Sequence, residues 1–242
     1  MVGLHGTGGT PRLMARFSHL PEAALARGFA LALPGALGQH GAEDPATGAA
    51  WNVGPGLGHP AFQEVDDAGF LAALAGTLAQ DHPVVPARAA LVGFSNGARM
   101  GWRLLFERPE AFRAFALVSG APDRPIPART PRRPVVVMHG RADRHIPFEG
   151  GVGAVGRHIP NAPIPESVHR LALAMGLPER PRRRFLGEHT CDRYGDDEVV
   201  LWSLAQGHAW PGGRPYAPGA DAPAPDLEAS SWILSFLSER LR

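Results

Sequence analysis

A serine flanked by glycines is the part of the sequence with the clearest chemistry. Residues 93–97 are Gly-Phe-Ser-Asn-Gly, which matches the G-x-S-x-G pattern of a nucleophile elbow. An apolar run at 90–92 precedes the pattern and a helical run at 99–106 follows it. Such a turn from strand to helix needs glycines near the serine, because the chain reverses sharply and leaves the hydroxyl exposed. This context favours Ser95 as a nucleophile.

A serine hydroxyl is a weak nucleophile and needs a base that a third group holds in place. Asp143 follows an apolar run at 134–139, and open α/β sheets bind their ligands at the carboxyl ends of such strands. His208 follows the apolar run 199–204 and precedes the last helical pattern. The order Ser95, Asp143, His208 is typical of the α/β-hydrolase fold. The sequence therefore predicts a catalytic triad of these three residues.

Acyl transfer also needs hydrogen-bond donors for the developing oxyanion. Residues 5–9 are His-Gly-Thr-Gly-Gly and directly follow the apolar run 2–4. Such a glycine-rich loop can supply one backbone N–H, and the residue after the nucleophile supplies another. We predict that the amides of Thr7 and Asn96 form the oxyanion hole. The alternative is a glycine-rich turn that only precedes a helix.

Two other patterns suggest different chemistry. His139, Asp143 and His145 could be metal ligands, but a strand followed by a turn seldom directs three such side chains at one point, so we expect no metal. Residues 151–156 match G-x-G-x-x-G, yet a loop precedes them and no helix start follows. A dinucleotide site there is not expected, and we predict no cofactor.

The composition is that of one globular domain. The chain of 242 residues is 44% hydrophobic and 19% charged, so it can bury one sizeable core, and we expect a single domain over residues 1–242. The formal net charge is +1 and the basic residues are scattered, apart from an arginine run at 182–184. Nucleic acid is therefore not an expected partner. We interpret the arginine run as a solvated strand face.

The sequence gives no sign of membrane insertion or export. No apolar stretch approaches the ~20 residues that cross a bilayer. The N-terminus enters a strand-like run without the charged region and cleavage site of a signal peptide. A single cysteine, Cys191, excludes an internal disulfide. As written, the chain is expected to be cytoplasmic.

Strand and helix patterns alternate along the chain. Short apolar runs indicate buried parallel strands at 2–5, 29–33, 89–94, 114–119, 134–139 and 199–204. Helical patterns lie at 13–27, 65–80, 95–107, 165–175 and 226–241. This alternation predicts a doubly wound, mostly parallel sheet with helices on both faces. Two stretches, 34–60 and 121–133, are too long for ordinary connections and are expected to be functional or mobile.

Six segments together resemble one known family, and they occur in its order over nearly the whole chain: residues 5–9, 51–52, 65–70, 93–97, 139–143 and 207–213. The family is that of polyhydroxybutyrate depolymerases and feruloyl esterases, within the α/β-hydrolase superfamily. Its most specific piece is Gly-His-x-Trp-Pro-Gly-Gly at 207–213. The resemblance implies a serine esterase that hydrolyses polyester, hydroxyacyl or aromatic acyl esters without metal or cofactor. It also implies that relatives are usually secreted.

The sequence departs from this family at two places. Members generally have further strands before the loop 5–9, so the resemblance implies that N-terminal edge strands of the sheet are missing here. Members also often pair a cysteine near Cys191 with one after the helix that ends near residue 175. Residues 176 and 177 are Gly and Leu, so we expect Cys191 to be a free, structural thiol.

The missing strands would leave the apolar run 29–33 beside an open sheet edge. An apolar edge strand is a site of unwanted pairing. We therefore expect the loop 34–60 to cover this edge, or a second copy of the chain to pair with it in a homodimer.

Aromatic side chains in the loops around the site are candidates for substrate binding. Trp51 and Trp210 each lie in a segment rich in Gly and Pro, and Trp210 is two residues after His208. We expect both, together with Phe94, to contact an acyl group, while Tyr216 lies in the same loop region. The alternative for most of these aromatic residues, Phe94 included, is packing in the core.

The same residues leave two further functional hypotheses open. Because a fold does not fix the acceptor, the machinery could pass the acyl group to an alcohol or cleave a thioester. A hydrolase-like binding protein with a disabled site is a third possibility, if the missing edge strands loosen the loop that carries Thr7.

Overall fold

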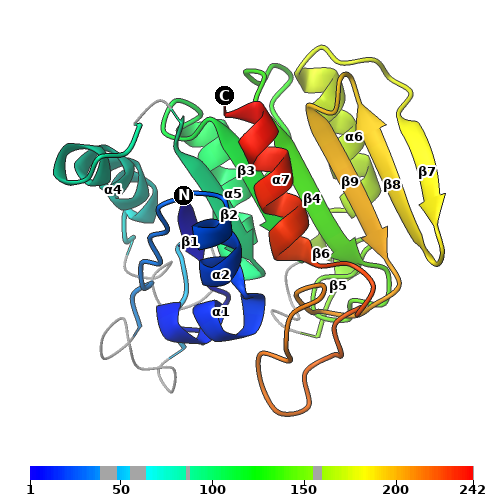
Figure 1. The fold of residues 1–242 in the computed structure, drawn as a ribbon. Coiled ribbons are helices and arrows are strands. Elements are labelled where there is room, and N and C mark those ends of the chain that lie inside the picture. Colours follow the sequence, from blue (N-terminus) through cyan, green and yellow to red (C-terminus); the bar gives the residue numbers. More distant parts are fainter. Residues whose placement is uncertain (39–47, 55–63, 86–87, 155–159, 242) are drawn as a thin grey trace.

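The computed structural model describes residues 1–38, 48–54, 64–85, 88–154 and 160–241. Over these residues the chain forms one seven-stranded sheet with the strand order β1-β2-β3-β4-β9-β8-β7 (Figure 1). The first five are parallel and run in this order: β1 (Val2–Leu4), β2 (Ala90–Phe94), β3 (Ala114–Val118), β4 (Val135–Gly140) and β9 (Val199–Leu204). Their carboxyl ends therefore meet at one edge of the sheet.

The far side of the sheet is antiparallel. β8 (His189–Tyr194) pairs antiparallel with β9, and β7 (Arg182–Leu186) pairs antiparallel with β8. The apolar runs in the sequence predict the parallel strands. For this hairpin the sequence predicts only that the arginine run 182–184 is a solvated strand face. All of β7 is exposed, which confirms that the arginine run faces solvent. Arg182 and Arg183 pair with Asp197 and Asp192.

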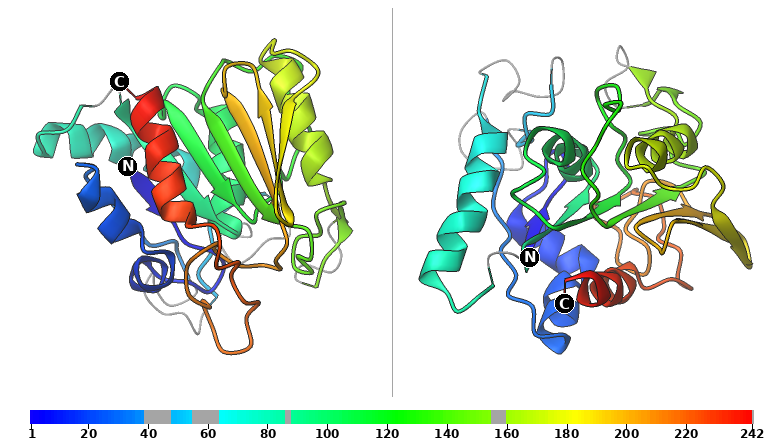
Figure 2. Two further views of the ribbon diagram at one scale, coloured as in Figure 1. Left: turned by 45° about the vertical axis from the view of Figure 1, so that its right-hand side comes forward. Right: turned by 90° about the horizontal axis from the view of Figure 1, so that it is seen from above.

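Helices cover both faces of the sheet. Figure 2 shows three on one face: α4 (Asp67–Asp81), α5 (Asn96–Glu107) and α6 (Ile164–Ala174). The opposite face carries α1 (Pro11–Ser18), α2 (Leu20–Ala26) and α7 (Ala229–Arg240). A separate two-stranded ladder joins β5 (Gly151–Val152) and β6 (Pro160–Asn161). The doubly wound architecture predicted from the alternating patterns is confirmed.

Each central strand contributes side chains to two cores. Leu91 belongs to the core under α4, α5 and α6, whereas its neighbour Val92 belongs to the core under α1, α2 and α7. Successive side chains of a strand point to opposite faces. Because both faces are covered, β2, β3, β4 and β9 are buried along their whole length. This explains why their sequences are continuous apolar runs instead of alternating ones.

The helical pattern at 13–27 forms two helices. The break lies at His19, whose φ of 57° is left-handed. Pro21 follows within the first turn of α2, and a proline at that position cannot belong to the interior of a continuous helix. The Ser18 hydroxyl accepts a hydrogen bond from the Leu20 N–H at 3.2 Å. The apolar periodicity continues across this break, which is why it predicts a single helix.

The predicted strand at 29–33 forms only a single parallel bridge, between Val2 and Ala32. The Gly3 N–H donates to the Ala32 carbonyl at 2.8 Å, and the Ala32 N–H donates to the Met1 carbonyl at 2.9 Å. A groove of about 720 Å³ lies beside this segment, at the amino ends of β1 and β2. Much of the loop 34–60 falls outside the described residues, so both the cover and the homodimer stay predictions.

The start of α5 lies against the end of β1, and this contact positions the whole functional edge. A Cβ on Gly97 would overlap the Leu4 carbonyl and lie 2.7 Å from the His5 carbonyl oxygen. By contrast, a Cβ on Gly76 in the exposed part of α4 would meet nothing within 4 Å. Gly97 therefore tests this close packing, and Gly76 is its matched control.

We expect Gly97→Ala to lower the free energy of unfolding by about 2 kcal/mol or more, because backbone atoms must move to admit the methyl group. Gly76→Ala should instead raise it by ~0.5–1 kcal/mol through helix propensity. Urea unfolding of the two variants and the wild type measures both effects. Equal stability of the two variants would contradict the close packing.

Candidate active site

Ser95 occupies a sharp turn between β2 and α5. Its φ of 55° and ψ of −118° are unusual for a residue with a side chain, and such a conformation costs roughly 1–3 kcal/mol. The Ser95 N–H donates to the Val118 carbonyl at 2.9 Å, and the Ser95 carbonyl accepts the Arg99 N–H at 3.0 Å. A Cβ on Gly93 would overlap the Gly97 carbonyl. The turn is therefore possible only with glycine at position 93.

The structure brings Ser95, Asp143 and His208 together, although 113 residues separate the serine from the histidine. His208 Nε2 lies 2.9 Å from Ser95 Oγ, and His208 Nδ1 lies 2.7 Å from Asp143 Oδ2. An ionised carboxylate only accepts hydrogen bonds, so Nδ1 carries the proton and Nε2 is left to accept one from the serine hydroxyl. His208 and Asp143 are 3% and 4% exposed, while Ser95 is partly accessible.

The turn that follows β4 holds the Asp143 carboxylate in place. Oδ1 accepts the backbone N–H groups of His145 at 2.8 Å and Ile146 at 2.9 Å. Burial raises the pKa of Asp143, but its contacts with His139 and His208 outweigh burial and hold that pKa well below its usual value. Asp143 is therefore an anion over the whole working range of pH.

His208 is held as a neutral imidazole. Burial lowers its pKa, and this effect outweighs the neighbouring Asp143, which raises the pKa. Its backbone N–H donates to Asp221 Oδ2 at 2.6 Å. The His145 ring lies edge-on at 4.8 Å between ring centroids. A neutral imidazole that is bonded on both nitrogens can accept a proton from the serine.

The glycine-rich loop after β1 lies directly beside Ser95. A Cβ on Gly6 would be 3.0 Å from the Ser95 Cβ, so only glycine fits without displacing the serine. Over the part of the chain that the structure describes, the Thr7 and Asn96 N–H groups have no hydrogen-bond acceptor. The Asn96 amide directly follows the serine, and the Thr7 amide follows the glycine that packs against it. Their part in an oxyanion hole stays a prediction.

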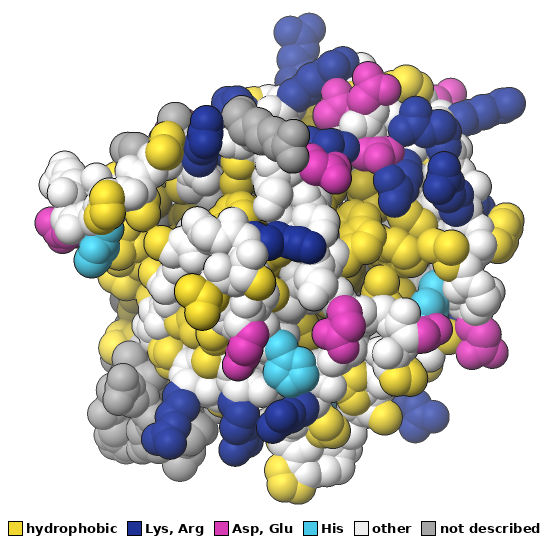
Figure 3. Space-filling model, in the orientation of Figure 1, with side chains coloured by type: hydrophobic (Ala, Val, Ile, Leu, Met, Phe, Trp, Pro, Cys, Tyr) yellow, Lys and Arg dark blue, Asp and Glu magenta, His cyan; other side chains and the backbone are white. Residues whose placement is uncertain are grey.

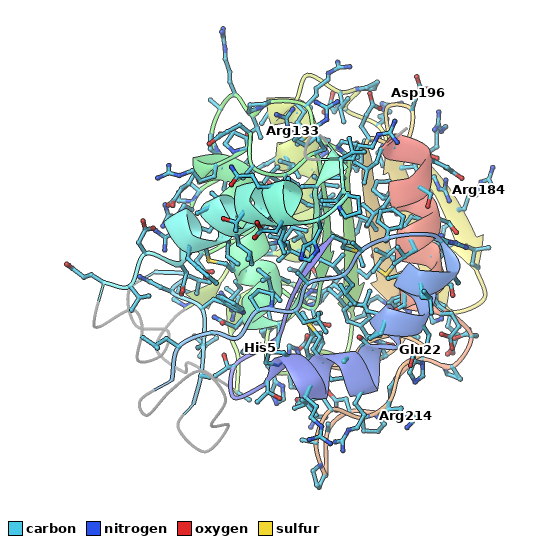
Figure 4. The ribbon with its side chains drawn as sticks, turned by 60° about the vertical axis from the view of Figure 1, so that its left-hand side comes forward. His5, Glu22, Arg133, Arg184, Asp196 and Arg214 are labelled. Carbon is cyan, nitrogen blue, oxygen red and sulfur yellow. The ribbon has the colours of Figure 1, made fainter. Side chains whose placement is uncertain are left out.

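Trp51 ties this loop to the elbow. Its indole Nε1 donates to the His5 carbonyl at 3.0 Å, and its backbone N–H donates to Asn96 Oδ1 at 2.6 Å. His5 follows β1 at the end of the sheet where α1 begins (Figure 4), and its Nε2 accepts the Ala36 N–H at 3.0 Å. The loop and the elbow therefore share one buried hydrogen-bond network.

Trp51, Phe94 and Trp210, the residues expected to contact a substrate, are 0%, 3% and 1% exposed. Their burial favours the alternative of packing in the core, and their role in substrate binding stays a prediction. Trp210 Nε1 donates to Ser230 Oγ at 3.1 Å. Trp51 and Trp210 are buried because the segments that carry them fold onto the core.

Tyr216 is the partly exposed member of this aromatic cluster. Its ring centroid lies 5.6 Å from that of Phe94 and 6.1 Å from that of His208. Burial raises the pKa of its hydroxyl. Tyr216 is thus a partly exposed aromatic side chain next to the His208 ring.

A buried charge cluster beside the elbow was missed by sequence reasoning. Arg99, one turn after Ser95, contacts Asp123 and Asn161 through its guanidinium group. Burial raises the pKa of Asp123 to about 6 despite the arginine. A signal was present in the sequence, because Arg99 falls on the inward side of the helix, where a charge needs a partner.

The charge cluster borders a cavity of about 690 Å³. Val53, Asp123, Asn161 and Arg170 are among its lining residues. Val53 in the lining comes two residues after Trp51, which bonds to Asn96. Pro122 comes two residues after Gly120, where a Cβ would lie 2.8 Å from the Ser95 carbonyl oxygen. Arg99, in the first turns of α5, contacts two of the lining residues, Asp123 and Asn161. The groove beside residues 29–32 lies at the opposite end of the strands.

The described residues contain no group of three His, Cys, Asp or Glu side chains placed to hold a metal ion. Residues 155 and 156 of the G-x-G-x-x-G pattern lie outside the described residues, and Gly151 and Val152 form β5. Among the helices in the described ranges, none is both long and apolar enough to cross a membrane. Cys191 is free and buried, as expected.

Several known proteins are similar to this chain, although no family model matches it. The protein named "Putative esterase NocK" from Nocardia uniformis subsp. tsuyamanensis is 32% identical over 241 residues, which covers 89% of this chain and 66% of that protein. An acetyl xylan esterase from Aspergillus awamori superposes with a TM-score of 0.60 at 15% identity, covering 86% of this chain and 82% of that one. The chain has the α/β-hydrolase fold.

A third similar protein is the Bacillus cereus carboxylesterase. Its TM-score is 0.52 at 13% identity, and it covers 99% of this chain and 88% of that chain. At such identities the two solved structures establish the fold. The resemblance to polyhydroxybutyrate depolymerases and feruloyl esterases stays a prediction, and this chain spans less than two thirds of the NocK sequence.

The lowered pKa of His208 makes the stability of this protein depend on pH. A histidine whose folded pKa is depressed binds a proton more readily in the unfolded chain, so stability is lost as pH falls below the unfolded value of about 6.5. We expect His208→Gln to flatten the fall in the free energy of unfolding between pH 7 and 5. The difference in slope should be at most about 1.4 kcal/mol per pH unit.

Denaturant unfolding at several pH values measures this slope. His5, whose pKa burial also lowers, is present in both proteins and cancels in the comparison. His82→Gln on the exposed end of α4 is the matched control and should keep the wild-type slope. A His208→Gln slope equal to that of the wild type would contradict a buried neutral imidazole.

Proposed function

We propose that this chain is a serine hydrolase of carboxylic esters. The observation that carries the proposal is the pair of hydrogen bonds of His208, at 2.9 Å to Ser95 Oγ and 2.7 Å to Asp143 Oδ2. In the first step His208 Nε2 takes the hydroxyl proton while Ser95 Oγ attacks the ester carbonyl carbon. Asp143 keeps the imidazole oriented and stabilises the imidazolium that forms.

The carbonyl oxygen becomes an oxyanion during this attack. The Thr7 and Asn96 N–H groups would donate to it, since both lie beside Ser95 with no other acceptor among the described residues. The helix α5 begins at Asn96, so its N-terminal dipole favours the same negative charge. The imidazolium then protonates the leaving alcohol, and water cleaves the acyl-enzyme by the reverse proton path.

The names of the relatives support ester hydrolysis. NocK, the Aspergillus protein and the Bacillus protein are each named as an esterase or carboxylesterase. Because this chain spans 66% of NocK, the activity is proposed here on the geometry of the triad as well as on these names. Polyester, hydroxyacyl and aromatic acyl esters are the proposed substrates, on the resemblance of the glycine-rich loop, the elbow and the histidine segment.

We expect Ser95→Ala to fold like the wild type and to lose at least about three orders of magnitude in kcat/KM for a p-nitrophenyl ester. Labelling by a fluorophosphonate probe should vanish with the same change. Ser231→Ala, on the exposed side of α7, is the matched control and should keep both. More than a tenth of wild-type activity in Ser95→Ala would overturn the proposed nucleophile.

The aromatic contact with an acyl group is assigned to Tyr216 in place of the buried tryptophans. A good aromatic contact contributes ~0.5–1.5 kcal/mol beyond burial. We expect Tyr216→Ala to raise KM for an aromatic acyl ester about three- to tenfold and to change KM for an acetate ester much less. Tyr216→Phe keeps the ring and should behave like the wild type. Equal losses on both esters would mean that Tyr216 supports His208 instead of the substrate.

A further inference from the structure

His139 is a buried titratable group that the proposed reaction does not use. It lies in β4, four residues before Asp143, and its side chain is 0% exposed. No substrate can reach it. Its neighbours are the residues that hold the acid, so any part in the reaction must act through Asp143.

One nitrogen of the His139 ring is fixed as a donor. Nε2 lies 2.8 Å from the Ile146 carbonyl oxygen, and a carbonyl can only accept, so Nε2 carries the hydrogen. Within the described ranges Nδ1 has no partner, and the Phe148 ring lies 6.1 Å away. The N–H that these contacts require therefore lies on Nε2.

The same N–H group also faces the catalytic carboxylate. His139 Nε2 lies 3.3 Å from Asp143 Oδ2, the oxygen that accepts from His208 Nδ1. The Ile146 residue links the two contacts, because its N–H donates to Asp143 Oδ1 at 2.9 Å while its carbonyl accepts from His139. Without His139, the Ile146 carbonyl would lose its donor and Asp143 Oδ2 would lose the nearby N–H.

We propose that His139 is a positioning residue that holds the turn of Asp143 and shares its carboxylate oxygen with His208. This inference rests on the proposed roles of Ser95, Asp143 and His208. A donor at Oδ2 withdraws part of the negative potential that His208 experiences, so the imidazolium is stabilised less. His139 thereby helps to keep the base neutral in slightly acidic solution.

Other groups also face His208 and remain unchanged when His139 is replaced. Asp143 and His145 come from the turn after β4, with the His145 ring at 4.8 Å. Ser95 comes from the elbow at 2.9 Å. The segment between β9 and α7 supplies Tyr216, at 6.1 Å between rings, and Asp221, at 2.6 Å from the His208 N–H. A shift in the titration of His208 on replacing His139 therefore reports the missing donor.

The test compares variants with and without a donor at this position. His139→Met has no donor and a similar volume, whereas the amide of His139→Gln can place an N–H where Nε2 lies. We expect His139→Met to move the acid limb of the kcat/KM profile upward by about half to one pH unit and to lower the plateau about tenfold. His139→Gln should keep the wild-type midpoint and most of the plateau. A purely structural role would lower stability in both variants and leave the midpoint unchanged.

A second measurement separates this inference from the proposed function. An NMR titration of the His208 ring, assigned by comparison with His208→Gln, follows the same midpoint without turnover. If the wild type hydrolyses no ester but the midpoint rises in His139→Met, the function fails and the positioning role stands. If the wild type is an esterase and the midpoints of wild type and His139→Met coincide, the positioning role is overturned. Should His139→Met not fold, His139→Asn, whose shorter amide cannot reach the Ile146 carbonyl, takes its place with the same expectation.

Discussion

The close approach of backbone to backbone around Ser95 is the constraint on which the rest of the site depends. Gly97 lies against the Leu4 carbonyl, and Gly6 lies against Ser95 itself. With no side chain at either place, the end of β1 and the start of α5 can bring two unused amides beside one hydroxyl. The strained backbone of Ser95 persists because the two covered faces of the sheet leave the elbow no other conformation. The geometry of the proposed site is therefore a result of packing, and the hydrogen bonds refine it.

The pKa values of Asp143 and His208 depend on how far neighbouring groups offset the effect of burial. Asp143 accepts three hydrogen bonds, from two backbone amides and His208, and His139 Nε2 lies 3.3 Å from its Oδ2. It therefore stays ionised in a place where a lone carboxylate would take up a proton. His208 has one anionic neighbour at its ring and is otherwise enclosed, so desolvation prevails and it stays neutral. The acid and the base are thus separated in pKa by their surroundings. In the surface view basic and acidic side chains are interspersed near β7 and β8 (Figure 3), so no large field of one sign acts on the site from there.

The sequence predicts features that depend on local pattern and misses those that depend on long-range packing. The order of strands and helices, the elbow at Ser95 and the candidates Asp143 and His208 follow from apolar runs and motif spacing. The break at His19 could not be found this way, because the apolar periodicity continues through it. The burial of Trp210 could not be found either, because it depends on how a Gly- and Pro-rich segment folds back onto the core. Arg99 and Asp123 meet only in three dimensions, and a lone buried charge gives no indication of its partner's place in the sequence.

The segment between β9 and α7 carries the base and also the aromatic ring beside it. Hydrogen bonds inside the segment hold its shape, since Asp221 accepts from the His208 N–H and Gln206 bonds to Ala209 and Ala224. Others join it to the helices, from the Trp210 indole to Ser230 Oγ and from the Arg214 N–H to the Phe17 carbonyl. His208 and Tyr216 therefore belong to one segment, whereas the sheet forms a separate scaffold. Divergence within this segment can alter which acyl groups are accepted while the elbow and the acid turn, which belong to other strands, keep their shape. Related proteins could therefore differ in substrate preference through changes in this one segment between β9 and α7.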